Sequence, residues 1–532
     1  MSKVYLKQFI NKKKIYISLI IFFIFSLYCA FTIGETWDHR DTLTRGKITL
    51  DYLFSFGEWD RNIVFREYYS TIYWSLKYLI TKLFPSQYQI EVSHLINLIF
   101  SLSAIIGLGK VCSEFFNKKI ARITCLILFF YPVFFGHMAI NPKDTILAFC
   151  HVWITYLLIK YIKKQEFDKK RNKYIINLSI LAALGTGIVL VFLGSLMPII
   201  FFIIADIFII KKIVSKNFNI KKLFYDFVKF FLIFYLILTL FWIDTHSNIL
   251  ILPLTFVLET FSANYFTGWA NNLINGNYLL AKDAPKSYLL INLFFKSPEF
   301  FLICYLIFIN LLFTSNEFFR KRIIFFNYKI CFLFIILLFP NLMLFFIPYP
   351  VYDGLRLFLW TIPYICIIPG LVIYYLIENF KNLKSKVTLI FLSLFIIYFL
   401  FNFFTITPYQ YTYLNFFNGK SEDRYRKFEN DYWGASIEDL IKTTDFNKSK
   451  NLKFGSCGLN DKILETSLFE NGYNNFSIVN IEDAEYVVMT NRVVQKENDN
   501  LELSTCFDRF PGNDLFNIKR NGLVLSTIRV KN

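Results

Sequence analysis

The sequence predicts a polytopic α-helical membrane protein with a small α/β domain at its C-terminal end. Of its 532 residues, 55% are hydrophobic and 20% are aromatic, more than one globular core can bury. Apolar runs of about 18 residues or more recur along the chain, and each is long enough to cross a bilayer. From about residue 405 the composition becomes polar. These observations predict membrane helices followed by a compact polar unit.

The apolar runs predict about eleven membrane helices, each close to the length that a bilayer requires. The first follows a basic N-terminal stretch, but its apolar run is too long for a signal peptide and no small-residue cleavage site follows it. It therefore reads as a retained signal anchor. The predicted helices cover residues 15–33, 91–113, 119–136, 144–161, 174–192, 196–213, 223–243, 288–314, 328–348, 357–378 and 387–405.

The basic residues predict which connections lie inside the cell. The net charge is +18, and lysine and arginine gather in short tracts between apolar segments, as in cytoplasmic loops. This pattern argues against nucleic-acid binding. It places the N-terminus in the cytoplasm and the C-terminus in the periplasm of a bacterial inner membrane. The predicted outer segments are 34–90, 137–143, 244–287, 349–356 and the tail from 406.

The polar tail predicts a second domain, so that residues 1–405 form the transmembrane domain and 406–532 a periplasmic α/β domain. Residues 453–457, 486–489 and 524–530 have strand patterns, and 437–442 has a helical one. A unit of about 100 residues is an ordinary domain size. Outside the cytoplasm Cys457 and Cys506 could form a disulfide, and the alternative is two free thiols.

The stretch 34–47 carries the first candidate site, because it leaves the first helix on the predicted outer side with several charged residues. A carboxylate such as Asp38 can act there as a general base or as a metal ligand. The alternative is a solvated loop acid. Glu35, Asp41, His39 and His137 are alternatives to Asp38 or helpers, although no His or Cys pair has a spacing specific for zinc.

A second candidate site precedes the helix predicted at 144–161. Asn141 can cap this helix, Pro142 suits its first position, and Asp144 lies in its first turn, where an acid favours the helix dipole. A purely structural role is therefore an alternative for Asp144. Lys143 adds a cation beside this anion, and a helix N-terminus favours ligands such as phosphate.

Two further outer loops carry candidate residues. Asp353 and Gly354 form a turn signal after Tyr352, and Arg356 enters a helix from the outer side. A guanidinium can bind phosphate through two hydrogen bonds, and the alternative is an arginine that extends to the membrane surface. The loop that contains Tyr278 and Lys282 is long enough to line a site.

Several stretches together resemble a known family. They are WDHRDTLTRGK, FFGHMAINPKDTILAF, NGNYLLAKDAP, YDGLRLFLWTIP and PYQYTYLNFFNG with DYWGAS, which end at about residue 434. Their order and loop placement resemble the GT-C superfamily of membrane glycosyltransferases, in the group with protein O-mannosyltransferases and the aminoarabinose transferase of lipid A. The resemblance implies a GT-C fold and a polyprenyl-phosphate-linked sugar as donor. It also implies catalytic acids at Asp38 and Asp144.

The implied reaction transfers the sugar at the outer face to a lipid, glycan or protein acceptor, with inversion and with Asp38 as base. Cations are needed where charge develops on the phosphate. The candidates for that role are Lys143, Arg356, Arg40 and Lys282. The predicted lining residues are His39, His137, Asn141, Tyr352, Asp353 and Tyr278. No cofactor is certain, and a divalent metal ion is one candidate.

Two other functions stay open from the sequence. A transporter or flippase of a lipid-linked sugar would place charged residues or broken helices near the bilayer midplane. Asp206 falls within a predicted span, but the prominent acids lie in outer loops. This distribution favours the enzyme. The third reading is an envelope-assembly factor that keeps the fold without catalysis.

Overall fold

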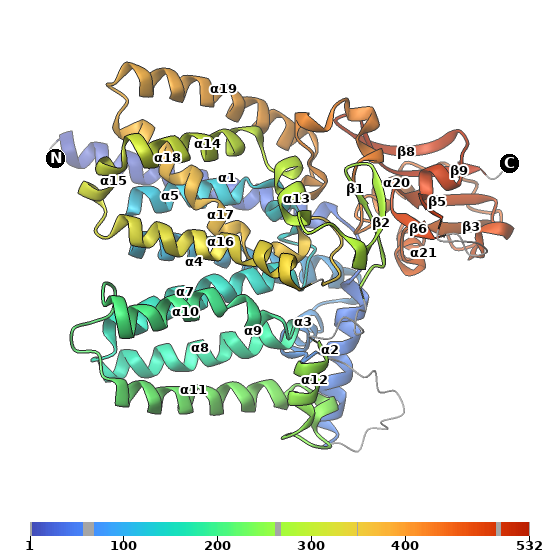
Figure 1. Cartoon of the computed structure of the whole chain (residues 1–532). Coiled ribbons are helices and arrows are strands. Elements are labelled where there is room, and N and C mark those ends of the chain that lie inside the picture. Colours follow the sequence, from blue (N-terminus) through green and yellow to red (C-terminus); the bar gives the residue numbers. More distant parts are fainter. Residues whose placement is uncertain (1–2, 57–68, 261–267, 348, 496–501, 531–532) are drawn as a thin grey trace.

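The computed structural model describes residues 3–56, 69–260, 268–347, 349–495 and 502–530, with side chains from residue 16 onward. Parts of the predicted outer segments, 57–68 and 261–267, therefore lie outside the described residues. Figure 1 shows helices running side by side, with the C-terminal strands gathered at one end of the bundle. The helix α1 (Lys3–Thr32) begins at the opposite end.

Helices occupy every segment that the sequence predicts as a span. Six of the described helices are long and apolar enough to cross a membrane, or seven when a bent pair is taken as one span. The total of about eleven therefore stays a prediction. The helices at these segments are α1, α4 (Gln89–Phe115), α5 (Lys118–Phe129) with α6 (Pro132–His137), α7 (Asp144–Lys164), α8 (Asp168–Ile188), α10 (Met197–Ala205), α11 (Ile220–Leu240), α13 (Tyr288–Lys296) with α14 (Glu299–Thr314), α16 (Phe326–Phe346), α17 (Ile362–Ile365) with α18 (Ile367–Glu378), and α19 (Leu383–Thr405).

Two of the predicted continuous helices are broken at prolines. The helix predicted at 119–136 divides into α5 and α6 because Pro132 lacks an N–H and keeps Tyr131 extended. The helix predicted at 288–314 bends by 114° between α13 and α14, where Pro298 begins the second piece. Both breaks deliver polar side chains to the end of the bundle that faces the strands.

Shorter elements lie at the end of the bundle toward which the strands also gather (Figure 1). They are α2 (His39–Phe54), α3 (Ile72–Thr81), α12 (Leu252–Thr260) and a hairpin of β1 (Asn271–Ile274) and β2 (Asn277–Leu280). Asn275 and Gly276 both have positive φ in the hairpin turn, the conformation that favours Asn-Gly there.

The C-terminal region contains a five-stranded mixed sheet in the order β4-β3-β5-β9-β8. β3 (Leu452–Cys457) pairs in parallel with β4 (Phe476–Ile478) and β5 (Tyr486–Thr490), while β9 (Leu523–Val530) is antiparallel to β5 and β8 (Asp514–Arg520). The strand patterns at 453–457, 486–489 and 524–530 thus coincide with β3, β5 and β9. One buried hydrophobic cluster runs from the helices into this sheet, so the domain division at residue 405 stays a prediction.

A disulfide joins Cys457 at the end of β3 to Cys506 at the start of α22 (Cys506–Arg509), with the two Cα atoms 5.8 Å apart. It links two parts of the tail that are 49 residues apart in the sequence.

Candidate active site

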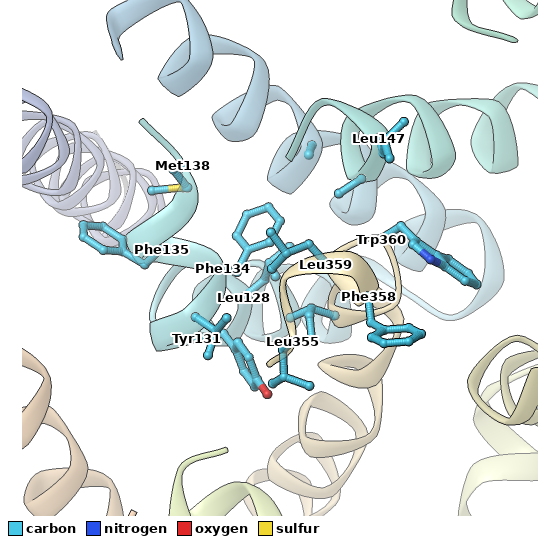
Figure 2. Packing of buried hydrophobic residues seen from close by; sticks show 14 of the residues in the cluster. Leu128, Tyr131, Phe134, Phe135, Met138, Leu147, Leu355, Phe358, Leu359 and Trp360 are labelled. Atoms are coloured by element: carbon cyan, nitrogen blue, oxygen red, sulfur yellow. The ribbon is translucent and has the colours of Figure 1, made fainter. Parts of the chain in front are cut away.

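Apolar packing holds the site-bearing segments together. Buried side chains from α5, α6, α7 and the segment after Arg356 form one cluster. Figure 2 shows its members Leu128, Phe134, Leu147, Leu355, Leu359 and Trp360 packing against one another. The polar residues next to these side chains in the sequence therefore lie near one another at the ends of the helices.

Arg356 is the centre of a buried polar cluster. Its Nη2 donates to Asp38 Oδ2 at 2.5 Å, its Nε to Asp144 Oδ2 at 3.0 Å, and its Nη1 to Asp353 Oδ2 at 2.9 Å. The ring of Trp433 lies 4.3 Å from the guanidinium carbon. Acids from two predicted outer segments and from the first turn of α7 thus meet on one guanidinium that is only 7% exposed.

Lys143 gives Asp38 a second cationic neighbour, with its Nζ 3.5 Å from Asp38 Oδ1. Burial raises the pKa of Asp38, but the charges of Lys143 and Arg356 lower it by more, so it lies below its ordinary value. Asp38 is therefore ionised at neutral pH. Burial lowers the pKa of Lys143, and the charge of Asp38 raises it above its ordinary value.

Asn141 contacts Asp144, and His137 lies next to Asn141. Asn141 Oδ1 accepts the backbone N–H groups of Lys143 and Asp144, both at 2.9 Å, so it pairs the first N–H of α7, although the N-cap position is held by Lys143 and not by Asn141 as the sequence predicts. Its Nδ2 donates to Asp144 Oδ2 at 2.9 Å. His137 Nε2 lies 2.8 Å from the hydroxyl of Tyr432. Tyr352 also faces the cluster, with its ring 5.9 Å from the Arg356 guanidinium.

Arg492 belongs to the same cluster, although no sequence pattern singles it out. Its Nη2 donates to Asp353 Oδ1 at 2.7 Å, and its Nη1 donates to the carbonyl of Tyr432 at 2.8 Å. It comes from the connection between β5 and β6 (Val493–Gln495) in the C-terminal region. Asp353 and Arg492 are 139 residues apart, so local sequence gives no signal for their contact.

Three further buried ionisable residues near the cluster also escaped prediction. A Cβ atom on Gly354 would come within 2.4 Å of Lys296 Nζ, so the glycine makes room for this amine. Glu429 Oε1 accepts the backbone N–H of Val493 at 2.9 Å, and burial raises the pKa of Glu429 to about 7. Lys77 Nζ donates to Thr42 Oγ1 at 2.9 Å, and burial lowers the pKa of Lys77 to about 7.

Four predicted site residues make their contacts outside this cluster. Arg40 binds both carboxylate oxygens of Glu35, at 3.1 and 3.0 Å. The ring of His39 is buried 5.9 Å from that of His94. The other two lie on the hairpin and just after it: the Tyr278 hydroxyl donates to Asp508 at 3.0 Å, and Lys282 is exposed. The roles predicted for these four residues stay predictions.

Among the described residues, no group of three or more His, Cys, Asp and Glu side chains is arranged to hold a metal ion. The three aspartates of the cluster pair with cations of the chain instead. The cluster therefore contains equal numbers of acidic and basic side chains. The acids are Asp38, Asp144 and Asp353, and the bases are Lys143, Arg356 and Arg492.

Comparisons with known proteins bear on the fold of the chain. No family model and no curated protein matches the sequence. Among solved structures, the chain is similar to ArnT from Cupriavidus metallidurans bound to undecaprenyl phosphate, with TM-score 0.50 and 10% identity. That match covers 97% of this chain and 98% of ArnT. The chain therefore shares the fold of this ArnT structure over nearly its whole length, in line with the fold that the sequence stretches predict.

Other solved structures show weaker likeness. ArnT from the same organism in the apo state has TM-score 0.47 and 12% identity, covering 96% of this chain and 97% of that one. The archaeal oligosaccharyltransferase AglB from Archaeoglobus fulgidus, in complex with an inhibitory peptide and a dolichol-phosphate, has TM-score 0.45 and 12% identity. The latter match covers 90% of this chain and 70% of AglB.

Proposed function

We propose that the protein transfers a sugar from a polyprenyl-phosphate-linked donor to a lipid, glycan or protein acceptor. The reaction takes place at the outer face of a bacterial inner membrane and inverts the anomeric centre. One observation carries this proposal: Asp38 and Asp144 meet at Arg356 beside Lys143. The fold that the chain shares with an ArnT structure bound to undecaprenyl phosphate supports it.

Lys143 and Arg356 are the proposed ligands of the donor phosphate. A guanidinium and an ammonium held in a buried site stabilise the negative charge that grows on a departing phosphate. Both groups already lie at the ends of helices and are held by carboxylates, so they need little reorganisation when the donor binds. The lipid chain of the donor would remain among the membrane lipids.

Asp38 is the proposed base. Its carboxylate takes the proton of the acceptor hydroxyl or amine as that oxygen or nitrogen attacks the anomeric carbon opposite the phosphate. The bond between the anomeric carbon and the phosphate oxygen breaks, and its electron pair leaves with the polyprenyl phosphate. Lys143 and Arg356 hold the pKa of Asp38 below its ordinary value. A donor phosphate that shares these two cations weakens this effect and makes Asp38 more basic.

The sidedness of the reaction rests on two features. A disulfide such as Cys457–Cys506 forms outside the reducing cytoplasm, which favours a periplasmic tail. The short helix α15 (Asn316–Arg322), with three basic residues in its last turn, lies at the end of the bundle opposite the strands. Both features agree with a site that faces the periplasm.

Asp206 gives no support to the transporter alternative. Its carboxylate accepts the backbone N–H groups of Lys212, Ile213 and Val214 and the hydroxyl of Tyr328. It therefore caps the end of α10 and of the π-helical turn that follows it. An acid with these contacts has a structural role at the helix end.

The test is Asp38→Asn in purified protein reconstituted with polyprenyl-phosphate-linked sugars, together with lipid analysis of cells for a missing glycan. Asp38→Asn should abolish transfer and leave membrane insertion intact. Asp41→Asn is the matched control, because Asp41 lies in the same stretch but forms an exposed pair with Arg45. Undiminished transfer by Asp38→Asn would remove Asp38 from the mechanism. Adding Mg²⁺ or Mn²⁺ after chelation tests the divalent ion, since carboxylate oxygens are the ligands these ions prefer.

A further inference from the structure

We propose that Arg492, from the C-terminal region, is a positioning residue that fixes Asp38 and Arg356 for sugar transfer. This inference rests on the proposed function and adds to it a requirement for the region that carries the sheet. Arg492 lies in a connection between strands, yet it is only 2% exposed. A buried arginine in a connection needs several fixed acceptors, and it finds them in the segments that form the site.

The first path from Arg492 runs through Asp353. One oxygen of this carboxylate binds Arg356 at 2.9 Å and the other binds Arg492 at 2.7 Å. Hydrogen bonds between charged groups are stronger than neutral ones and fix geometry well. Without Arg492, the Asp353 carboxylate loses one of its two anchors and can rotate away from Arg356.

The second path runs through Trp37, the residue directly before Asp38. Its ring lies 4.8 Å from the Arg492 guanidinium, and its backbone N–H donates to the carbonyl of Trp433 at 3.2 Å. Arg492 itself holds the neighbouring carbonyl of Tyr432. Arg492 therefore restrains Asp38 through the preceding residue, Trp37, whose ring it contacts.

The two paths close a ring of contacts: Arg492, Asp353, Arg356, Asp38 and Trp37. In such a ring the base and the phosphate-binding guanidinium are each held from two sides. Both terminal nitrogens of Arg492 bind protein acceptors, and Trp269 lies 4.1 Å from its guanidinium carbon. Arg492 thus orients the reacting groups and does not contact the donor.

The test compares Arg492→Lys with Arg520→Lys. A lysine keeps the charge but cannot present the two nitrogens that reach Asp353 and Tyr432. Arg520 is the matched control, because it also donates to a backbone carbonyl outside the sheet, that of Thr407 just after α19, and pairs with Asp439, away from the ring. Misplacement of reacting groups by about 1 Å can cost about 10²-fold in rate. We therefore expect a loss of that size in kcat for Arg492→Lys, with KM for the donor nearly unchanged and Arg520→Lys fully active.

A double-mutant cycle with Asp353→Asn adds a readout that general destabilisation does not move. Because Arg492 acts partly through Asp353, the double variant should lose less activity than the two single losses combined predict. If Arg492→Lys does not fold, Trp37→Leu opens the ring at the neighbouring contact and should lower kcat in the same way. An inactive wild type would refute the proposed function and this inference with it. An active wild type with full activity in Arg492→Lys would refute the inference alone.

Discussion

Glu429 offers a prediction that follows from burial alone. Its side chain is 5% exposed and accepts the backbone N–H of Val493, and burial raises its pKa from 4.5 to about 7. Glu429→Gln keeps the size of the side chain and the acceptor oxygen but removes the titration. The variant therefore isolates the free-energy cost of a buried negative charge next to Arg492.

The sign and size of the effect follow from the two pKa values. Between pH 4.5 and about 7 the folded protein keeps a proton on Glu429 that the unfolded chain has released. The contribution of Glu429 to the free energy of unfolding of the wild type therefore falls as pH rises through this window, and this contribution is constant outside it. The full fall corresponds to about 3 kcal/mol. Glu429→Gln has no such fall, so its stability relative to the wild type should increase with pH.

The measurement is thermal unfolding of both proteins in one detergent at pH 5, 6, 7 and 8, followed by tryptophan fluorescence. Taking the difference in Tm removes the contribution of every other titrating group. The gain of Glu429→Gln over the wild type should be larger at pH 8 than at pH 5. Glu485→Gln, at an exposed acid in the same region, should show no such trend. A difference in Tm that is the same at all four pH values would refute the reasoning.

Two further predictions concern the cluster and the tail. Arg356→Lys keeps the charge but cannot reach three carboxylates, so it loses at least two charge-assisted hydrogen bonds of about 1.5–3 kcal/mol each. The value of kcat/KM should therefore fall by about 10²-fold or more. A fall below tenfold would contradict the central role of Arg356. Cys457→Ser removes a crosslink that spans 49 residues. Under oxidising conditions the free energy of unfolding of Cys457→Ser should be about 4 kcal/mol lower than that of the wild type, and under reducing conditions the difference should disappear. Equal stability of the variant and the wild type under oxidising conditions would contradict the prediction.

The sequence predicts the part of the site that membrane topology alone brings together. Asp38, Asp144 and Arg356 follow or precede apolar segments, and alternation of sides places all three at the same surface. A role for Asn141 at the start of α7 was predictable because such contacts are local, and its side chain accepts the first N–H of the helix, although the N-cap position is Lys143. These inferences need only the order of helices and the chemistry of helix ends.

The rest of the site depends on contacts that leave no local pattern. Arg492 and Glu429 come from the polar region, where charged residues are common, and only the docking of that region buries them. Tyr278 and Lys282 lie in an outer loop that the sequence predicts on the same side as the site, but the hairpin directs the first toward Asp508 and leaves the second exposed. The breaks at Pro132 and Pro298 were missed because hydropathy over a long window averages across single prolines.

Two neighbouring cations lower the pKa of Asp38, which is unfavourable for a base. The changes of charge within the whole cluster during transfer offset this disadvantage. The proposed donor is a phosphodiester with one negative charge, whereas the polyprenyl phosphate that it would release carries up to two. As the phosphate gains negative charge, Asp38 loses its own by taking the acceptor proton. The net charge of the buried cluster therefore stays constant during transfer, which matters in a region of low dielectric constant. Asparagine at position 38 cannot take up this proton, so the growing phosphate charge would be uncompensated in Asp38→Asn even with Lys143 and Arg356 in place.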